Sequence, residues 1–502
     1  MSSCVFTIVA KNYIGLAQIL EKSFLLYNQD VDFKIFVADE LFDVSENSLP
    51  DNVYEAKKIL KNVPEEQWYE MAFKYNLTEF CTSIKPFIFS YLFEERKYDK
   101  VIYLDPDILV FSTFSDILQK LDKYSILLTP HVSLLHKVYN GELSENSFLT
   151  TGVYNLGFLA LKGEPEVYSF LDWWSLRLTN YCFNEQLDSC FTDQKWMDFL
   201  PCFFTSEKLL IYRNLGCNVA PWNFFERAIK VYDNGNAYVI QRNSSIENEV
   251  PLVFVHYSGY NYREILKGNI VQNNIKEDIN YVDIDYLFSK YKEFLLENRE
   301  LFEHYIGLDY TYNYFSNGTP LISFYRRIFR ACLNKDRTLG NPFDIRGETS
   351  FYRQLGKHNL LDKSSVMVDK ISRYNVPNIS RKLFWVNIIM HILKKVLGMN
   401  RFLLLIRLFR AYSRYETYIF MYDWKYKKSN LFVDRRKYGI LIHSQKGIIM
   451  KFIMLLYLNF VHCVVMKLLL FQIKRLLPII VSWLIFRIQV YINIVSIALG
   501  KN

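Results

Sequence analysis

Two aspartates one residue apart, Asp105 and Asp107, are the strongest candidates for chemistry in this chain of 502 residues. They stand between two apolar runs, 101–104 and 108–111, and the first run is typical of a buried parallel strand. Pro106 fixes the backbone between the two carboxylates. Two unpaired anions at this spacing would repel each other, so a divalent cation that prefers oxygen ligands is favoured. The alternative interpretation is a surface turn with two solvated aspartates.

The segments around this pair alternate between strand and helix patterns. Apolar runs that predict strands lie at 4–10, 33–38, 100–104, 124–129 and 153–161, and helical patterns lie at 13–27, 64–95, 115–121 and 164–180. This alternation predicts an α/β fold with a mostly parallel sheet flanked by helices. Ligands bind such sheets at the carboxyl ends of the strands, which is where Asp105 and Asp107 are expected to lie. The segment 131–150, which is polar at its end, is predicted to be a loop.

Further short strands are predicted later in the chain, at 199–205, 217–220, 238–241 and 252–256. His256 ends the last of these strands and is a candidate third metal ligand. An imidazole beside two carboxylates favours Mn²⁺ over Mg²⁺. The alternative is a histidine that is hydrogen-bonded at the edge of the sheet for structural reasons.

The segment Tyr103-Leu104-Asp105-Pro106-Asp107 resembles the metal-binding Asp-x-Asp motif of nucleotide-sugar glycosyltransferases with the GT-A fold. The resemblance is to family 8, the glycogenin and galactosyltransferase-like enzymes, and to their bacterial relatives. The other matching segments follow in the family's order: Cys4-Val5-Phe6-Thr7-Ile8-Val9-Ala10 with Asn12-Tyr13, Asn155-Leu156-Gly157-Phe158, Asp193-Gln194, and His256-Tyr257-Ser258-Gly259. The resemblance covers about residues 4–262 and departs after Gly259, where Tyr260-Asn261-Tyr262 replaces the Lys-Pro-Trp tail often seen there.

The resemblance implies metal-dependent transfer of a hexose from a UDP-sugar to a glycan or lipid-linked acceptor, in surface polysaccharide synthesis. The implied ligands of Mn²⁺ or Mg²⁺ are Asp105, Asp107 and His256. The implied donor-binding residues are Thr7, Ala10, Asn12, Tyr13, Lys85 and Gly259. The implied catalytic residues are Asn155, Asp193 and Gln194.

The stereochemical outcome depends on the last two residues. If Gln194 lies against the β-face of the donor sugar and Asp193 binds its hydroxyls, the anomeric configuration is retained. If Asp193 instead reaches the acceptor hydroxyl, it acts as a base and the configuration inverts. The sequence leaves both outcomes open, although the resemblance favours retention.

Two other functions fit some of these features. A sugar-phosphate nucleotidyltransferase also uses metal-binding carboxylates on an α/β sheet, but it normally has a glycine-rich basic loop after the first strand. Here that loop is Lys11-Asn12-Tyr13-Ile14-Gly15, which is not glycine-rich and so argues against this function. A non-catalytic, membrane-attached sugar-binding scaffold could also keep the same fold.

The length and composition of the chain predict that it has several structural parts. A chain of 502 residues is too long for one ordinary core. We expect a GT-A domain at 1–265, a mainly helical accessory region at 266–434, and a basic, apolar tail at 435–502 that is membrane-associated or unstructured. The eight cysteines form no Cys-x-x-Cys motif, so we expect a reducing compartment and neither a zinc site nor a disulfide framework. No leader peptide is expected, which predicts a cytoplasmic protein.

The charge is divided unevenly along the chain. Residues 383–502 hold 19 Lys and Arg against 3 Asp and Glu, whereas the whole chain has a net charge of +8. The carboxy-terminal part is therefore strongly basic and the rest mildly acidic. Basic side chains among Leu, Ile and Phe indicate contact with an anionic membrane surface, peripherally on its inner face, and not with nucleic acid.

Overall fold

A computed structural model describes residues 2–45, 49–244, 248–272, 281–333, 340–362 and 378–422. These residues all belong to one compact unit. The predicted tail at 435–502 lies outside the described residues.

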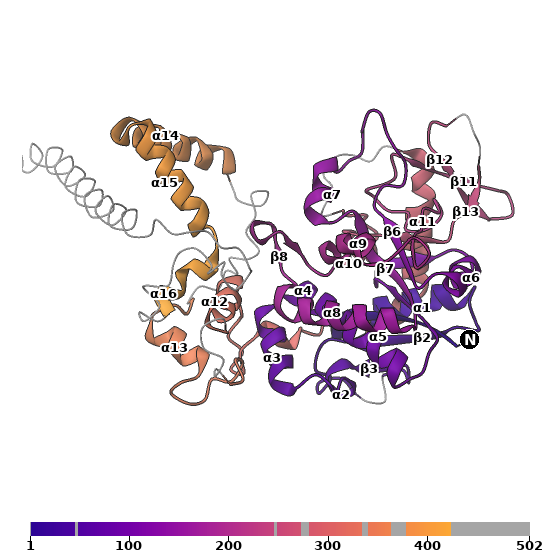
Figure 1. Ribbon diagram of the computed structural model, residues 1–502, viewed down its shortest axis with the longest axis horizontal. Helices are drawn as coiled ribbons and strands as arrows, with labels where there is room; N and C mark the ends of the chain where they lie inside the picture. The colour runs from indigo at the N-terminus through magenta and orange to yellow at the C-terminus, as the bar shows by residue number, and fades with distance from the viewer. Residues whose placement is uncertain are drawn as a thin grey trace, which may run out of the picture. The chain divides into compact units, whose positions relative to one another are not determined.

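The centre of this unit is a seven-stranded sheet (Figure 1). Its strands, in spatial order, are β10 (Leu209–Ile211), β6 (Ile126–Pro130), β7 (Tyr154–Lys162), β4 (Lys100–Leu104), β1 (Ser3–Val9), β2 (Asp32–Val37) and β3 (Val53–Glu55). All neighbours pair in parallel except β7, which is antiparallel to β4 and β6. The predicted α/β fold with a mostly parallel sheet is confirmed.

Helices cover both faces of this sheet. On β1, Phe6 and Ile8 join one hydrophobic core while Val5 and Val9 join the other, because successive side chains of a strand point to opposite faces. The first core is closed by α3 (Glu65–Lys74), α4 (Leu77–Ser83), α5 (Lys85–Glu94) and α8 (Pro165–Tyr181). The second is closed by α1 (Ile14–Leu25) and α6 (Ser115–Lys123). Figure 1 shows α5 and α8 side by side.

The helical pattern predicted at 64–95 is divided into three helices. Asn76 and Glu79 form a capping box that starts α4, so α3 ends just before them. Pro86 stands in the first turn of α5, where a missing backbone N–H costs little. The division places Lys85 at the first position of α5.

Two predicted strands are wrong. Segment 199–205 is mostly helical, because η4 (Gln194–Phe199) runs into α9 (Leu200–Phe203) and Pro201 suits the first turn of a helix better than a sheet. Segment 217–220 forms a single bridge, between Val219 and Val255, and Asn218 has a positive φ of 54°. The predicted loop 131–150 also contains most of a short helix, α7 (Glu145–Thr151).

Smaller elements flank the main sheet. They are η1 (Lys11–Tyr13), α2 (Ala56–Ile59), the hairpin of β8 (Asn184–Glu185) and β9 (Cys190–Phe191), and the antiparallel sheet of β11 (Arg227–Val231), β12 (Ala237–Gln241) and β13 (Val250–Pro251). A separate antiparallel pair joins β5 (Ile108–Val110) to β14 (Phe254–His256). This last pair positions the candidate metal ligands.

The remaining described residues are mainly helical. Their elements are α10 (Tyr262–Ile265), η5 (Val282–Ile284), α11 (Asp285–Glu297), η6 (Arg299–Phe302), η7 (Thr311–Asn313), α12 (Ser323–Leu333), α13 (Phe351–Lys357), α14 (Ile379–Leu397), α15 (Met399–Tyr412), η9 (Tyr415–Tyr418) and α16 (Ile419–Tyr422). Arg326 of α12 donates hydrogen bonds to the carbonyls of Ala72, Phe73 and Tyr75, so α12 is fixed to the end of α3.

The predicted domain boundary near residue 265 stays a prediction. In the described ranges, no helix has both the length and the apolar character needed to cross a membrane.

Candidate active site

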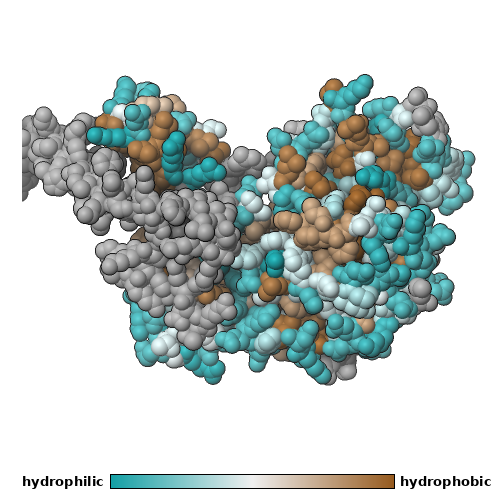
Figure 2. Space-filling model, in the orientation of Figure 1, coloured by the Kyte–Doolittle hydropathy of each residue, from teal (hydrophilic) through white to brown (hydrophobic). Residues whose placement is uncertain are grey.

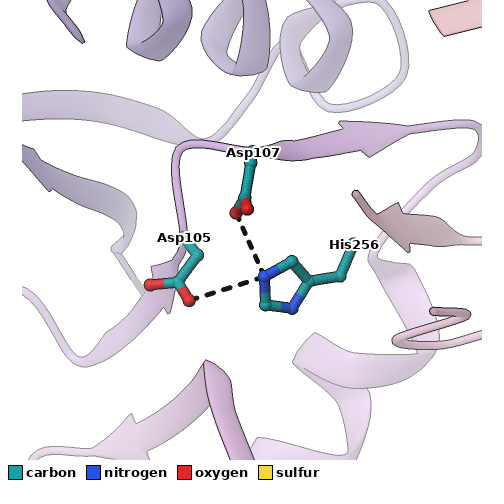
Figure 3. Close-up of side chains that lie close together, drawn as sticks. All are labelled: Asp105, Asp107 and His256. Carbon is teal, nitrogen blue, oxygen red and sulfur yellow. Dashed lines mark ion pairs between the residues drawn. The ribbon is translucent and has the colours of Figure 1, made fainter. Parts of the chain in front are cut away.

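Three potential metal ligands meet at the edge of the main sheet. Asp105 directly follows β4, Asp107 directly precedes β5, and His256 is the last residue of β14, opposite Ile108 in the β5–β14 pair. Figure 3 shows the three side chains pointing toward one another. His256 Nε2 is 3.0 Å from Asp107 Oδ1 and 3.6 Å from Asp105 Oδ2, and one ligand atom of each residue lies within 4.8 Å of the others. Two carboxylates and one imidazole nitrogen form a donor set that suits Mn²⁺ or Mg²⁺.

The electrostatics of this cluster favour an added positive charge. Burial raises the pKa of the Asp105 carboxyl, Asp107 raises it further, and Lys85 and His256 oppose the change. Burial alone would lower the pKa of His256, but the ion pair and hydrogen bond with Asp107, together with Asp105, bring it above its ordinary value. The carboxylates therefore favour a positive charge at this position, which a divalent cation would supply.

The orientation of His256 is fixed from behind by Asn155. His256 Nδ1 is 3.2 Å from Asn155 Oδ1, and an amide oxygen can only accept, so the hydrogen lies on Nδ1 and Nε2 faces the carboxylates. The same oxygen accepts hydrogen bonds from Gly157 N at 3.1 Å and from Asn218 Nδ2 at 3.0 Å. A Cβ atom on Gly157 would lie 2.4 Å from His256 Cε1, so this position leaves no room for a side chain. The Asn-x-Gly segment therefore supports the histidine.

A buried ion pair lies beside the cluster. Lys85 Nζ is 2.7 Å from Asp193 Oδ2, and the two side chains are 2% and 3% exposed. Lys85 also donates to the carbonyl of Leu156 at 2.9 Å, lies 3.9 Å from the centroid of the Tyr103 ring, and is 4.0 Å from Asp105 Oδ1. Lys85 thus connects Asp193 to the carboxylate cluster, and its positive charge is held in one place.

Both ends of the Gln194 amide are held by the protein. Nε2 donates to the carbonyl of Thr151 at 3.0 Å, and Oε1 accepts from Leu156 N at 3.2 Å and from Asn155 Nδ2 at 3.4 Å. Gln194 is 7% exposed. Of the three predicted catalytic residues, Asn155 contacts His256 directly. Asp193 is connected to Asp105 through Lys85, and Gln194 is connected to His256 through Asn155.

The other predicted donor-binding residues lie at the end of β1 and just after it. Ala10 is buried and its carbonyl accepts from Tyr13 N at 2.9 Å, and the Tyr13 ring meets the edge of Tyr262 with a centroid distance of 5.1 Å. Among the described residues, Thr7 Oγ1 and Asn12 Oδ1 are buried without a hydrogen-bond partner. Buried polar atoms normally have partners, so these two are available to a ligand.

Gly259 lies beyond the third candidate ligand, in the turn that follows β14. Its φ is +81°, a conformation that residues with a side chain adopt only under strain. This turn leads into Tyr260-Asn261-Tyr262, where Asn261 caps α10. Gly259 therefore sets the direction of the chain as it leaves the candidate metal ligand His256.

Two further residues with buried polar atoms had not been predicted. Asp39 lies two residues after the end of β2 and is fully buried, and Tyr310 belongs to the segment before η7. Asp39 Oδ2 and the Tyr310 hydroxyl have no partner among the described residues, while Thr311 N donates to Asp39 Oδ1 at 3.1 Å. The position of Asp39 at the end of the predicted strand 33–38 was a signal for this site. Tyr310 carries no such signal, because it reaches β2 only through the tertiary fold.

The Asp39 carboxyl predicts a pH dependence of stability. Burial raises its pKa to about 6 from an ordinary value of 3.8, and the nearby Lys11 only partly offsets this. The folded state therefore disfavours the anion: the cost is absent below about pH 4, grows as pH rises, and is complete above about pH 6, at about 3 kcal/mol. We expect Asp39→Asn to stabilise the protein by about 2–3 kcal/mol at pH 7.5 and by about 1 kcal/mol at pH 4.5.

Urea unfolding of the Asp39→Asn variant at several pH values would measure this effect. Asp172→Asn, on the exposed side of α8, is a matched control and should change stability by less than about 0.5 kcal/mol. A stabilisation by Asp39→Asn that does not vary with pH would contradict the prediction.

No family model matches the chain. It is 24% identical to the uncharacterized protein YfnF of Bacillus subtilis (strain 168) over 328 residues, which are 63% of this chain and 98% of that protein.

The chain is also similar to several solved structures. One is the galactosyltransferase LgtC in complex with donor and acceptor sugar analogues, at 18% identity over 51% of this chain and 87% of that chain, with a TM-score of 0.31. Another is mouse xyloside xylosyltransferase 1, at 10% identity over 44% and 87%, with a TM-score of 0.28. A third is the glycosyltransferase GlyE of Streptococcus pneumoniae TIGR4, at 13% identity over 63% and 66%, with a TM-score of 0.31. These structures are glycosyltransferases, the class that the sequence motifs resemble.

Proposed function

We propose that this chain is a metal-dependent GT-A glycosyltransferase that moves a hexose from a UDP-sugar to a glycan or lipid-linked acceptor. The observation that carries the proposal is the cluster of Asp105, Asp107 and His256 at the carboxyl end of the sheet, with the Lys85–Asp193 ion pair beside it. Transfer from a nucleoside diphosphate requires the charge of the leaving group to be neutralised, and a bound Mn²⁺ or Mg²⁺ would act as a Lewis acid on the diphosphate. Asp105, Asp107 and His256 would hold that ion.

The nucleotide would bind at the ends of β1 and β2. Thr7 and Asn12 have free polar atoms there, and Asp39 and Tyr310 add two more. A nucleobase offers both donors and acceptors along its edge and would satisfy such atoms. Ala10, Tyr13 and Gly259 would shape the path from the base to the phosphates, and Lys85 would act on the diphosphate and donor sugar through its fixed charge.

We propose that transfer retains the anomeric configuration. An inverting enzyme needs a base that reaches the acceptor hydroxyl. Asp193 is 2% exposed and its carboxylate is paired with Lys85, which suits a sugar-positioning residue better than a base. Gln194 and Asn155, whose amides are held by the protein, would fix the surface against which the donor sugar lies.

The wider biological assignments are part of the same proposal. The GT-A domain is assigned to 1–265, the accessory region to 266–434 and the membrane-associated tail to 435–502. A role in surface polysaccharide synthesis at the inner face of the membrane is consistent with the +16 charge of residues 383–502, which favours anionic lipid. The acceptor would then be presented at that surface.

A donor-hydrolysis assay tests the proposal against its rivals. The full chain with Mn²⁺ and each of UDP-glucose, UDP-galactose and UDP-N-acetylglucosamine should release UDP slowly in water. A sugar-phosphate nucleotidyltransferase would instead release pyrophosphate from UTP and a hexose 1-phosphate. Binding of UDP without any turnover, even with acceptor glycans present, would favour the non-catalytic scaffold and contradict the transferase.

The role of His256 gives a second test. His256→Ala should weaken Mn²⁺ binding by about tenfold or more and shift the preference toward Mg²⁺, because the only nitrogen ligand is lost from the set. Electron paramagnetic resonance of free Mn²⁺ measures the affinity without any need for activity. His304→Ala, at an exposed histidine, is the control. An unchanged Mn²⁺ titration for His256→Ala would mean that this residue is structural.

A further inference from the structure

Helices α14 and α15 differ from the rest of the described chain in charge. Together with Gly398 they span residues 379–412, which contain seven Lys and Arg and no Asp or Glu. Among the residues that the structure describes, none of these seven cations, Arg381, Lys382, Lys394, Lys395, Arg401, Arg407 and Arg410, forms an ion pair. The segment therefore presents a concentrated positive charge without internal compensation.

The same helices expose large apolar side chains. Trp385, Ile389, Ile392 and Val396 are spaced at i, i+4, i+7 and i+11, which places them on one face of α14, and we call them the apolar stripe. Each is more than half exposed: 56%, 54%, 54% and 52% respectively. No residue of α14 is buried. Figure 2 shows hydrophobic and hydrophilic side chains together on the surface where α14 and α15 lie.

Most polar residues of α14 lie away from this stripe, and Arg381 at the start of the helix is in line with it. Asn387 and Lys394 fall on the opposite face of the helix, at 3.6 residues per turn. Gly398, with a φ of +74°, ends α14 and lets α15 begin in a new direction, and α15 continues the pattern with Phe409 exposed beside Arg410. α14 also exposes Leu383, Phe384 and Val386 outside the stripe. A basic helix with exposed apolar side chains is typical of elements that lie in a membrane interface.

We propose that α14 docks on an anionic lipid surface, with the apolar stripe inserted among the lipid chains and the basic residues of α14 and α15 at the headgroups. Charge decides between the candidate occupants. A second copy docked here would bring two segments with seven cations each close together, whereas anionic headgroups would neutralise them. α14 has 19 residues and is about 28 Å long, which is enough for a helix that lies on a membrane surface. Its Asn, His and two central Lys would be costly inside the bilayer, so it is not expected to cross it.

The proposal is independent of the transferase activity and of the tail at 435–502. It is tested by hydrogen–deuterium exchange, which measures protection of the α14 peptides separately from the rest of the chain. Lipid binding through another segment would therefore not give the expected result. Hydrogen–deuterium exchange of the full chain should slow in peptides covering 383–397 when vesicles of phosphatidylcholine and phosphatidylglycerol (1:1) are added. Vesicles of phosphatidylcholine alone should give much weaker protection.

Two variants of equal charge separate insertion from simple attraction. Ile389→Glu and Asn387→Glu each add one negative charge to an exposed position of α14, but only Ile389 belongs to the apolar stripe. We expect Ile389→Glu to abolish the protection and to lower vesicle binding through this segment by about tenfold or more, and Asn387→Glu to lower it by less than about fivefold. Protection of 383–397 that is unchanged by anionic vesicles would overturn the proposal, as would equal effects of the two variants. Protection that rises with protein concentration in the absence of lipid would instead assign this face to a second copy.

Discussion

Replacing Asp105 and Asp107 together by asparagine should lower the rate of UDP release by on the order of a thousandfold. Asparagine keeps the shape of each side chain but removes two negative charges from the only described cluster of three metal-ligating side chains. The metal would then be lost at ordinary concentrations, and the diphosphate would leave without charge compensation. EDTA should abolish the activity of the natural protein in the same way, and Mn²⁺ should restore it best.

Thermal unfolding separates this effect from misfolding. Without metal, the natural protein holds two carboxylates close together, so the double variant should be at least as stable as the natural protein in EDTA. Asp172→Asn, far from the cluster in sequence and exposed on α8, should keep full activity. A double variant that turns over at the natural rate in EDTA would rule out a metal-dependent mechanism.

Lys85→Met should destabilise the fold by about 3–5 kcal/mol, in addition to reducing activity. Lys85 and Asp193 are both buried and lie 2.7 Å apart, so removal of the lysine leaves the Asp193 carboxylate without its partner. It also removes the hydrogen bond that Lys85 donates to the Leu156 carbonyl. Urea unfolding at neutral pH measures the loss.

A double-mutant cycle assigns the loss to the ion pair. Adding Asp193→Asn to Lys85→Met removes the unpaired charge and should recover about half or more of the lost stability. Lys58→Met is the control: it breaks an ion pair with Glu55 in which the lysine side chain is 73% exposed. It should change the free energy of unfolding by less than about 1 kcal/mol. Additive effects of the Lys85 and Asp193 substitutions would show that the two side chains do not depend on each other.

Local sequence signals located the strands that matter most for the site. The runs at 4–10, 33–38, 100–104 and 153–161 are apolar and bounded by polar residues, and the structure has β1, β2, β4 and β7 there within about two residues. Segment 199–205 shows the weakness of the same signal. Its aromatic residues are compatible with either a strand or a helix. Pro201 and the packing of Phe203 against Trp173 of α8 favour the helix.

Contacts between distant segments could not be predicted in this way. Asp105 and His256 meet because β5 pairs with β14, across about 150 residues of chain, and only that pairing turns three separate side chains into one cluster. The resemblance to known motifs pointed to these residues, but not to their hydrogen-bond partners. The roles of Asn155 and Gly157 behind His256, and of Lys85 with Asp193, follow from packing that has no periodicity in sequence.

By itself, the sequence determined the α/β class, the two carboxylates at a strand end and the basic character of the carboxy-terminal part, because each depends on residues that are neighbours in the chain. Tertiary structure decided which groups share the site. Tyr310 and Thr311 lie about 270 residues after Asp39 and yet reach the end of β2, and Thr311 N binds the Asp39 carboxylate. It also decided that the apolar stripe of α14 stays exposed. A helical pattern shows which face of a helix is apolar, but only the folded chain shows whether another element covers that face.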